Sequence, residues 1–107
     1  MSQIVQIITT TATADDARRI ARALVERRLA ACVQIVGPIE SIYRWEGKIE
    51  TANEFQCWIK TRAELYDQVE QAVRELHPYE VPEILAVPVV QGDVAYLNWL
   101  RQETRRD

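Results

Sequence analysis

One histidine and two acids supply the densest set of metal-ligand side chains in this chain. His77 is the only histidine, and Glu80 and Glu83 follow it in the segment HPYEVPE. An imidazole with neighbouring carboxylates can bind Cu(II) or Zn(II), and an oligomer multiplies such sites. The structural alternative is a histidine at the C-terminus of a helix, held by the helix dipole and the turn at Pro78. The segment has neither CxxC nor HxxxH spacing, so both interpretations stay open.

Two thiols are the other candidates for binding a soft metal. In the hairpin described below, Cys32 lies beside Lys60, whose ammonium would favour the thiolate. The alternative is that Cys32 is a small core residue, as free cysteines commonly are. Cys57 is expected in the core, on the sheet face opposite Cys32. We therefore predict two reduced thiols and no disulfide within the chain.

The sequence contains few signs of a catalytic site. It contains no Ser-His-Asp order, no G-x-S-x-G motif and no recognisable Cys-His pair. Its three glycines, at positions 37, 47 and 92, do not form a phosphate-binding loop. We predict that the protein is not an enzyme and has no catalytic residues.

A long β-hairpin, Leu29 to Thr61, must position the candidate residues. Its turn contains Glu46 and Gly47. A three-residue loop with only Gly47 at positive φ is expected, because a residue with a Cβ resists that conformation. The resulting register pairs Arg44 with Lys48, Tyr43 with Ile49, Ile35 with Cys57 and Val33 with Ile59. One face of the hairpin then carries Val33, Ile35, Ile39, Tyr43, Ile49, Phe55, Cys57 and Ile59.

The arms of this hairpin are longer than one small domain can cover. Residues 48–61 extend about 46 Å as a strand, whereas a compact domain of this length is roughly 33 Å across. We expect the tip to overhang and dock on another subunit, since an isolated two-stranded ribbon is unstable. The alternative is a bent hairpin that folds back on its own domain. The predicted interface residues are Tyr43, Trp45, Ile49 and Trp58.

Polar residues near the same interface are candidates for ligand binding. Glu54, Lys60 and Tyr79 are predicted to line a cleft between subunits, with Trp45 beside them, that binds a small anion or metabolite. In the alternative, Lys60 and Glu54 form an ion pair at the interface, and Trp45 anchors the neighbouring subunit.

The rest of the chain alternates strands and helices. β-Branched residues predict a strand over 3–11, and an apolar stripe predicts a helix over 15–28 capped by Thr13. A second helix is predicted over 62–76, opened by a capping box between Thr61 and Glu64.

Two prolines mark the last strand, which is predicted over 81–90. Pro82 and Pro88 each remove a ladder donor, which indicates an edge strand. A third helix is predicted over 94–103 with Asp93 as its cap, and the polar ending RQETRRD is expected to fray.

This order predicts an α+β fold: a ferredoxin-like βαββαβ sandwich with a long central hairpin and a C-terminal helix. Residues 1–107 are predicted to form one domain. The helices suffice to cover one sheet face only, so the other face is expected to pack against further copies of the chain.

The composition excludes several classes of protein. The net charge is −3 and the pI about 5.2, which argues against a sequence-independent nucleic-acid binder. No apolar run reaches the roughly 18 residues of a membrane span. The N-terminal segment lacks the basic region and cleavage site of a signal peptide, so a cytoplasmic location is expected.

The segments LAACV, IYRWEGKIE, NEF…WIKT and LHPYEVPEI…YLNWL resemble the CutA family of divalent-cation-tolerance proteins over nearly the whole length. The resemblance implies a ferredoxin-like homotrimer whose hairpins reach across neighbouring subunits and whose sheets face the centre, much as in PII signalling proteins. It also implies a link to tolerance of copper and other divalent metals, and some members bind copper.

This chain departs from the family at the copper ligands assigned in bacterial members. Those members have a cysteine at the end of the first strand and a His-His pair before Pro-Tyr, whereas this chain has Thr9 and Leu76-His77. The resemblance therefore implies metal binding near His77 with a different set of ligands. The alternative is a PII-like regulatory or scaffolding module that binds a small ligand or partner protein in clefts between subunits.

Overall fold

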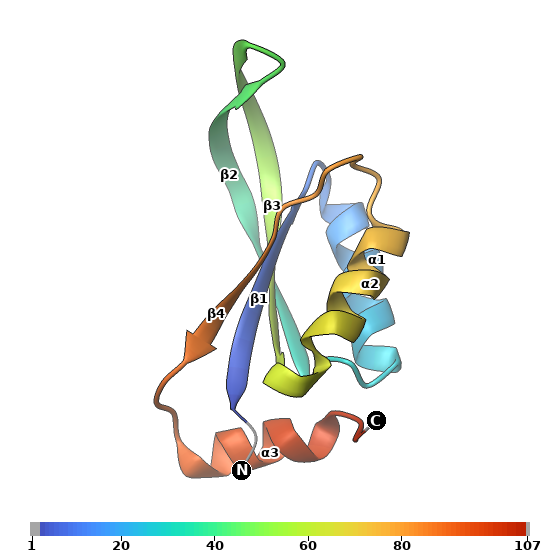
Figure 1. Ribbon diagram of the computed structural model, residues 1–107, viewed down its shortest axis with the longest axis vertical. Coiled ribbons are helices and arrows are strands. Elements are labelled where there is room, and N and C mark those ends of the chain that lie inside the picture. Colours follow the sequence, from blue (N-terminus) through green and yellow to red (C-terminus); the bar gives the residue numbers. More distant parts are fainter. Residues whose placement is uncertain (1–2, 107) are drawn as a thin grey trace.

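The computed structural model describes residues 3–106 and has a mixed α+β architecture (Figure 1). One antiparallel sheet contains four strands in the order β2-β3-β1-β4. The predicted fold class and its edge strand β4 are confirmed. Along the chain the elements are β1 (Ile4–Thr11), α1 (Ala14–Glu26), β2 (Cys32–Trp45), β3 (Lys48–Arg62), the 3-10 turn η1 (Ala63–Leu65), α2 (Tyr66–Leu76), β4 (Ile84–Val89) and α3 (Val94–Glu103).

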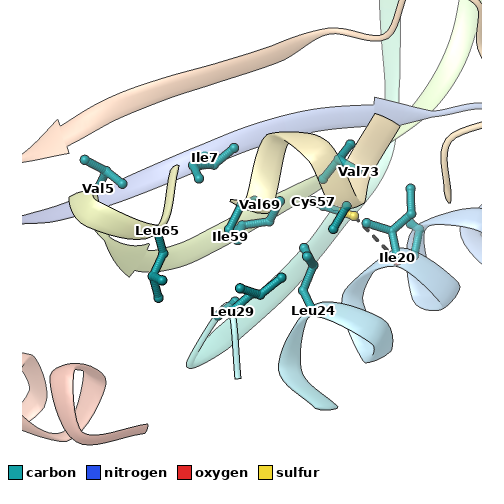
Figure 2. Close-up of a cluster of buried hydrophobic side chains, with 13 residues drawn as sticks. Val5, Ile7, Ile20, Leu24, Leu29, Cys57, Ile59, Leu65, Val69 and Val73 are labelled. Atoms are coloured by element: carbon teal, nitrogen blue, oxygen red, sulfur yellow. Dashed lines mark hydrogen bonds between the residues drawn. The ribbon is translucent and has the colours of Figure 1, made fainter. Parts of the chain in front are cut away.

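Helices α1 and α2 pack on one face of the sheet and enclose the core (Figure 2). The Thr13 side chain caps α1 by accepting a hydrogen bond from the backbone of Asp16 at 3.1 Å, as predicted. The apolar side of α1 meets the alternating inward side chains of β1 and β3. The largest side chains that are fully buried there are Ile7, Ile20, Leu24, Ile59, Leu65, Val69 and Val73.

The hairpin turn has two residues, so the predicted three-residue loop is wrong. Trp45 pairs with Lys48, and both intervening residues have positive φ, 50° at Glu46 and 79° at Gly47. These angles are typical of a type I′ turn, whose twist matches that of the flanking strands. Placing Glu46 in the left-handed region is energetically unfavourable. The conformation persists because the long hydrogen-bonded ladder of β2 and β3 fixes the turn.

The register of the hairpin changes partway along β2. Near the body, Ile35 pairs with Cys57 as predicted, but near the tip Tyr43 pairs with Glu50 and not with Ile49. A β-bulge between Val36 and Ile39 accounts for the difference, because Gly37 and Pro38 add one residue to β2. A Cβ on Gly37 would lie 2.6 Å from the Phe55 ring, so a glycine is needed at this close approach.

The bulge exchanges the two faces of the β2 side of the tip relative to the prediction. Ile39 pairs with Glu54 and Tyr43 with Glu50, so Ile39 and Tyr43 lie on the face away from α1 and α2. The sequence had placed both residues on the face of Cys57.

The tip of the hairpin projects beyond the helices, as the length argument predicted (Figure 1). The molecule measures 45 × 26 × 21 Å, and the hairpin lies along the longest dimension. Apolar side chains on the tip remain exposed, with Ile42 at 68% and Ile49 at 69%.

The second helix begins later than predicted, and the capping box is wrong. The Thr61 hydroxyl donates to the carbonyl of Leu29 at 2.6 Å and so does not cap the helix. The chain forms η1 first, and α2 starts at Tyr66 with no side-chain cap at either N-terminus.

The C-terminal segment is held against the body, so the expectation that it frays is wrong for residues 101–105. The Arg62 side chain is 3% exposed; its Nε donates to the Thr104 hydroxyl at 3.0 Å, and its guanidinium also donates to the carbonyl of Arg105. The backbone of Arg105 donates to the carbonyl of Arg28 at 2.8 Å. A buried guanidinium needs several acceptors, and the residues that follow α3 provide two of them.

Candidate functional site

A pocket of about 570 Å³ lies where the hairpin leaves the body of the molecule. Three parts of the chain form it: the end of β1, the tip-side halves of β2 and β3, and the loop from α2 to β4. Its lining residues are Thr10, Ser41, Ile42, Tyr43, Trp45, Glu54, Tyr79, Glu80, Val81 and Glu83.

The corrected register explains why these strand residues meet. Ser41, Tyr43 and Glu54 share the sheet face away from α1 and α2, because the bulge shifts β2 by one residue. In the predicted register Tyr43 faced the opposite side from Glu54, so the sequence did not bring them together.

A chain of hydrogen bonds fixes the α2–β4 loop over the end of β1. The Nε2 of His77 lies 2.6 Å from the carbonyl oxygen of Thr10, which can only accept, so Nε2 carries the proton. Nδ1 then accepts from the backbone N–H of Tyr79 at 3.1 Å. The Tyr79 hydroxyl in turn donates to Oε2 of Glu54 at 2.8 Å. His77 is 7% exposed, and its neutral ring positions Tyr79.

The pocket is electrostatically negative. Burial and the hydrogen bond to Glu54 raise the pKa of Tyr79, which keeps its hydroxyl protonated. Burial and the charge of Glu54 raise the pKa of Glu83 as well. Glu80 contributes a third carboxyl group, and none of the lining residues among positions 3–106 is a lysine or arginine.

The predicted metal ligands are only partly brought together within one chain. His77, Glu80 and Glu83 lie in one loop, with Glu80 and Glu83 exposed. Cys32 pairs with Lys60 near the other end of the sheet, far from that loop. Within residues 3–106 no group of three histidine, cysteine or acidic side chains is arranged to hold a metal ion.

The predicted cleft residues divide in the same way. Glu54 and Tyr79 bond to each other in the pocket, whereas Lys60 lies six residues from Glu54 along β3, or about 20 Å. Lys60 donates to the side chain of Gln34.

The structure places the two thiols in different environments. Cys57 is fully buried, and burial raises the pKa of its thiol to about 11, which confirms it as a core residue. Cys32 is partly exposed on the other face, and both thiols are free.

The four residues predicted for a subunit interface all lie away from the main core. Tyr43 and Trp45 are 44% and 46% exposed and also line the pocket, and Ile49 is exposed on the tip. Trp58 is partly exposed on the face without α1 and α2. Leu85 and Val87 of β4 add exposed apolar surface to that face, at 56% and 46%.

Sequence reasoning missed four lining residues: Thr10, Ser41, Ile42 and Val81. One available signal was Gly37-Pro38 within a predicted strand, a pair typical of a β-bulge. Recognising the bulge would have placed Ser41 and Tyr43 on the face of Glu54. Among the described residues, no helix is long and apolar enough to cross a membrane.

The chain matches a family model and several curated proteins. Residues 5–103 match the model described as "CutA1 divalent ion tolerance protein". The human "Protein CutA" is 52% identical over 88 residues, which cover 82% of this chain and 49% of the human protein. The "Divalent-cation tolerance protein CutA" of Thermus thermophilus is 45% identical over 92% of this chain and 95% of its own length. The chain thus spans about half the length of the mammalian relatives it matches.

Solved structures show the same arrangement of elements. CutA1 from Oryza sativa superposes with a TM-score of 0.96 at 39% identity, covering 99% of this chain and 97% of that one. The "Periplasmic divalent cation tolerance protein CutA" from Archaeoglobus fulgidus superposes with a TM-score of 0.89 at 41% identity, covering 96% and 98%.

Proposed function

Because this chain belongs to the CutA1 divalent ion tolerance family, we propose that it contributes to divalent-metal tolerance by binding the metal, Cu(II) first among candidates. It acts without catalysing a reaction, as a cytoplasmic homotrimer. The names of these relatives support the tolerance role, because they describe tolerance proteins and not enzymes.

The observation that carries the proposal is the pair of exposed carboxylates in the α2–β4 loop. Glu80 and Glu83 follow His77 by three and six residues in the sequence, and both side chains are exposed to solvent. The lone pair of His77 at Nδ1 accepts from Tyr79, so a metal ion bound by this ring replaces that hydrogen bond. Since one chain lacks three converging donors within the described residues, a complete site draws further donors from a neighbouring copy, with Cys32 the soft candidate.

Exposed apolar surface supports assembly into a trimer. The overhanging tip leaves Ile49 exposed, and the sheet face without α1 and α2 exposes Leu85 and Val87. Apolar surface of this extent on a small chain is typical of an interface. The predicted interface residues Tyr43, Trp45 and Trp58 border the same region.

Calorimetric titration of Cu(II) into the reduced protein tests the metal proposal, with light scattering to measure the mass of the assembly. We expect submicromolar binding, with a whole number of ions per trimer, that is lost in His77→Ala and in the double variant Glu80→Gln/Glu83→Gln. Glu103→Gln, on α3 at the far end, is the matched control (Figure 1). If His77→Ala and the double variant both bind Cu(II) like the wild type, the α2–β4 loop is not part of the metal site. A monomeric mass would exclude the trimer.

The second candidate is a PII-like module that binds a small ligand or a partner protein. The pocket at the base of the hairpin supports it, because a cavity of this size suits a small organic molecule. This function predicts indifference to metal and ligand-dependent protection from hydrogen exchange around Tyr79.

A further inference from the structure

The carboxylate of Glu54 is buried without a positive partner. Its side chain is among the buried polar groups at 7% exposure, and Oε2 accepts a hydrogen bond from Tyr79. Among residues 3–106, Glu54 forms no ion pair, and its second oxygen, Oε1, receives no hydrogen bond. Oε1 is not among the fully buried side-chain atoms that lack a partner, so it is open to the pocket, where a cation or another donor can reach it.

The walls around Glu54 favour a cation with an organic body. Glu80 and Glu83 add negative charge, whereas three aromatic rings, Tyr43, Trp45 and Tyr79, line the same space. Ammonium groups are attracted to aromatic faces as well as to carboxylates. Apolar contact is provided by Ile42 and Val81. We propose that this pocket binds an aliphatic primary amine, whose ammonium group donates to Oε1 of Glu54 while its methylene groups pack against the aromatic rings.

An organic ammonium fits this pocket better than a bare metal ion. A divalent metal needs several converging oxygen or nitrogen donors, and the described residues contain no such group of three. An ammonium needs fewer: one carboxylate oxygen, a ring face and hydrogen-bond acceptors suffice. An anion is disfavoured, because every charged residue of the lining is acidic.

The hydrogen bonds around Tyr79 prepare the site before any ligand arrives. His77 holds the backbone of Tyr79, and the Tyr79 hydroxyl holds Oε2, so Oε1 of Glu54 is the oxygen left for the ligand. Fixing the acceptor in advance lowers the ordering cost of binding. His77 therefore acts here as a positioning residue.

Calorimetry with 1,4-diaminobutane tests the proposal on the protein in its native assembly. Its matched uncharged analogue is 1,4-butanediol. We expect saturable binding of the diamine, weakening as salt is raised, and no binding of the diol. Glu54→Gln should weaken the diamine at least about tenfold, because it removes the negative charge that assists the hydrogen bond from the ammonium group. Glu103→Gln should bind like the wild type.

Three results would overturn the proposal. They are the absence of diamine binding, equal binding of diamine and diol, and equal affinities of Glu54→Gln and Glu103→Gln. Circular dichroism of each variant shows whether it is folded, and Tyr43→Ala gives a second test, since loss of one ring should weaken the amine without touching Glu54. If Cu(II) or Zn(II) binds in place of the amine and Glu54→Gln abolishes that binding, the pocket is a metal site. The metal proposal is tested separately, because His77→Ala and Glu80→Gln leave the Glu54 carboxylate intact.

Discussion

Replacing Tyr79 by phenylalanine should destabilise the folded protein chiefly through Glu54. The substitution removes one hydroxyl, and with it the 2.8 Å hydrogen bond to Oε2 of Glu54. Because Glu54 is 7% exposed, water cannot readily replace the lost donor. A hydrogen bond to a charged group contributes about 1.5–3 kcal/mol. Since Tyr79 itself is half-buried, we expect the free energy of unfolding to fall by about 2 kcal/mol.

The comparison that isolates this effect is Glu54→Gln. An amide oxygen still accepts from the Tyr79 hydroxyl, so this variant should change the free energy of unfolding by less than about 1 kcal/mol. Urea denaturation of wild type, both single variants and the double variant at one protein concentration gives the coupling between the two residues. A loss below about 0.5 kcal/mol in Tyr79→Phe, or full additivity in the double variant, would refute the reasoning.

The same contact gives a pH dependence of known sign. The folded state raises the pKa of Tyr79, so the folded protein holds this proton more tightly than the unfolded chain does. The stabilisation is therefore complete below the unfolded tyrosine pKa of about 10 and declines as the pH rises above it. The difference in stability between wild type and Tyr79→Phe should stay constant from neutral pH to about pH 9 and then shrink. A difference that grows above pH 10 would contradict this sign.

Three further predictions concern other parts of the chain. With Ellman's reagent near pH 8, at most one thiol per chain should react quickly, because burial raises the pKa of Cys57 whereas Cys32 is partly exposed; two fast thiols would contradict the burial. Arg62→Ala should lower the free energy of unfolding by about 3 kcal/mol and release the end of α3 to proteases, as followed by mass spectrometry of limited tryptic digests; an unchanged digest would show that the end is held by other contacts. Glu46→Asn should raise stability by about 0.5–1 kcal/mol in thermal unfolding, because asparagine tolerates positive φ in an Asn-Gly turn; a loss would argue against the two-residue turn.

Regular local patterns made most of the fold predictable. The helical stripe of α1 with its Thr13 cap, the third helix with its Asp93 cap and the proline-marked edge strand all appear near their predicted positions. In each case the sequence pattern and the tertiary environment favour the same conformation. The overhang followed from strand length alone.

The errors arose where tertiary contacts outweigh local preference. Thr61 has the spacing of a capping residue, but its hydroxyl bonds to Leu29 across the fold. From its residue type Arg62 would be expected on the surface, but the segment that follows α3 packs over it, and Thr104 accepts a hydrogen bond from its Nε. Neither contact leaves a periodic signal, because each joins segments far apart in the sequence.

The candidate site was predictable in its components but not in its assembly. Glu54, Tyr79, Glu80 and Glu83 were all singled out, yet which of them meet depends on the register of the tip. That register depends on the bulge at residues 37 and 38, which the hydrophobic pattern does not reveal.

The bulge also bears on how this hairpin can change during evolution. Alternation ties the two faces of an ordinary strand together along its whole length, so a one-residue deletion exposes its core. Here, losing one residue at positions 37–38 would turn the bulge into a regular ladder, because Val36 already pairs with Gln56 and Ile39 with Glu54. The tip and the body would both keep their present sides, with Val33 and Ile35 still in place against the body. A change of one codon at this point would therefore preserve both the surface of the tip and the stability of the body. The bulge is thus the place where β2 can lose a residue without exposing its core.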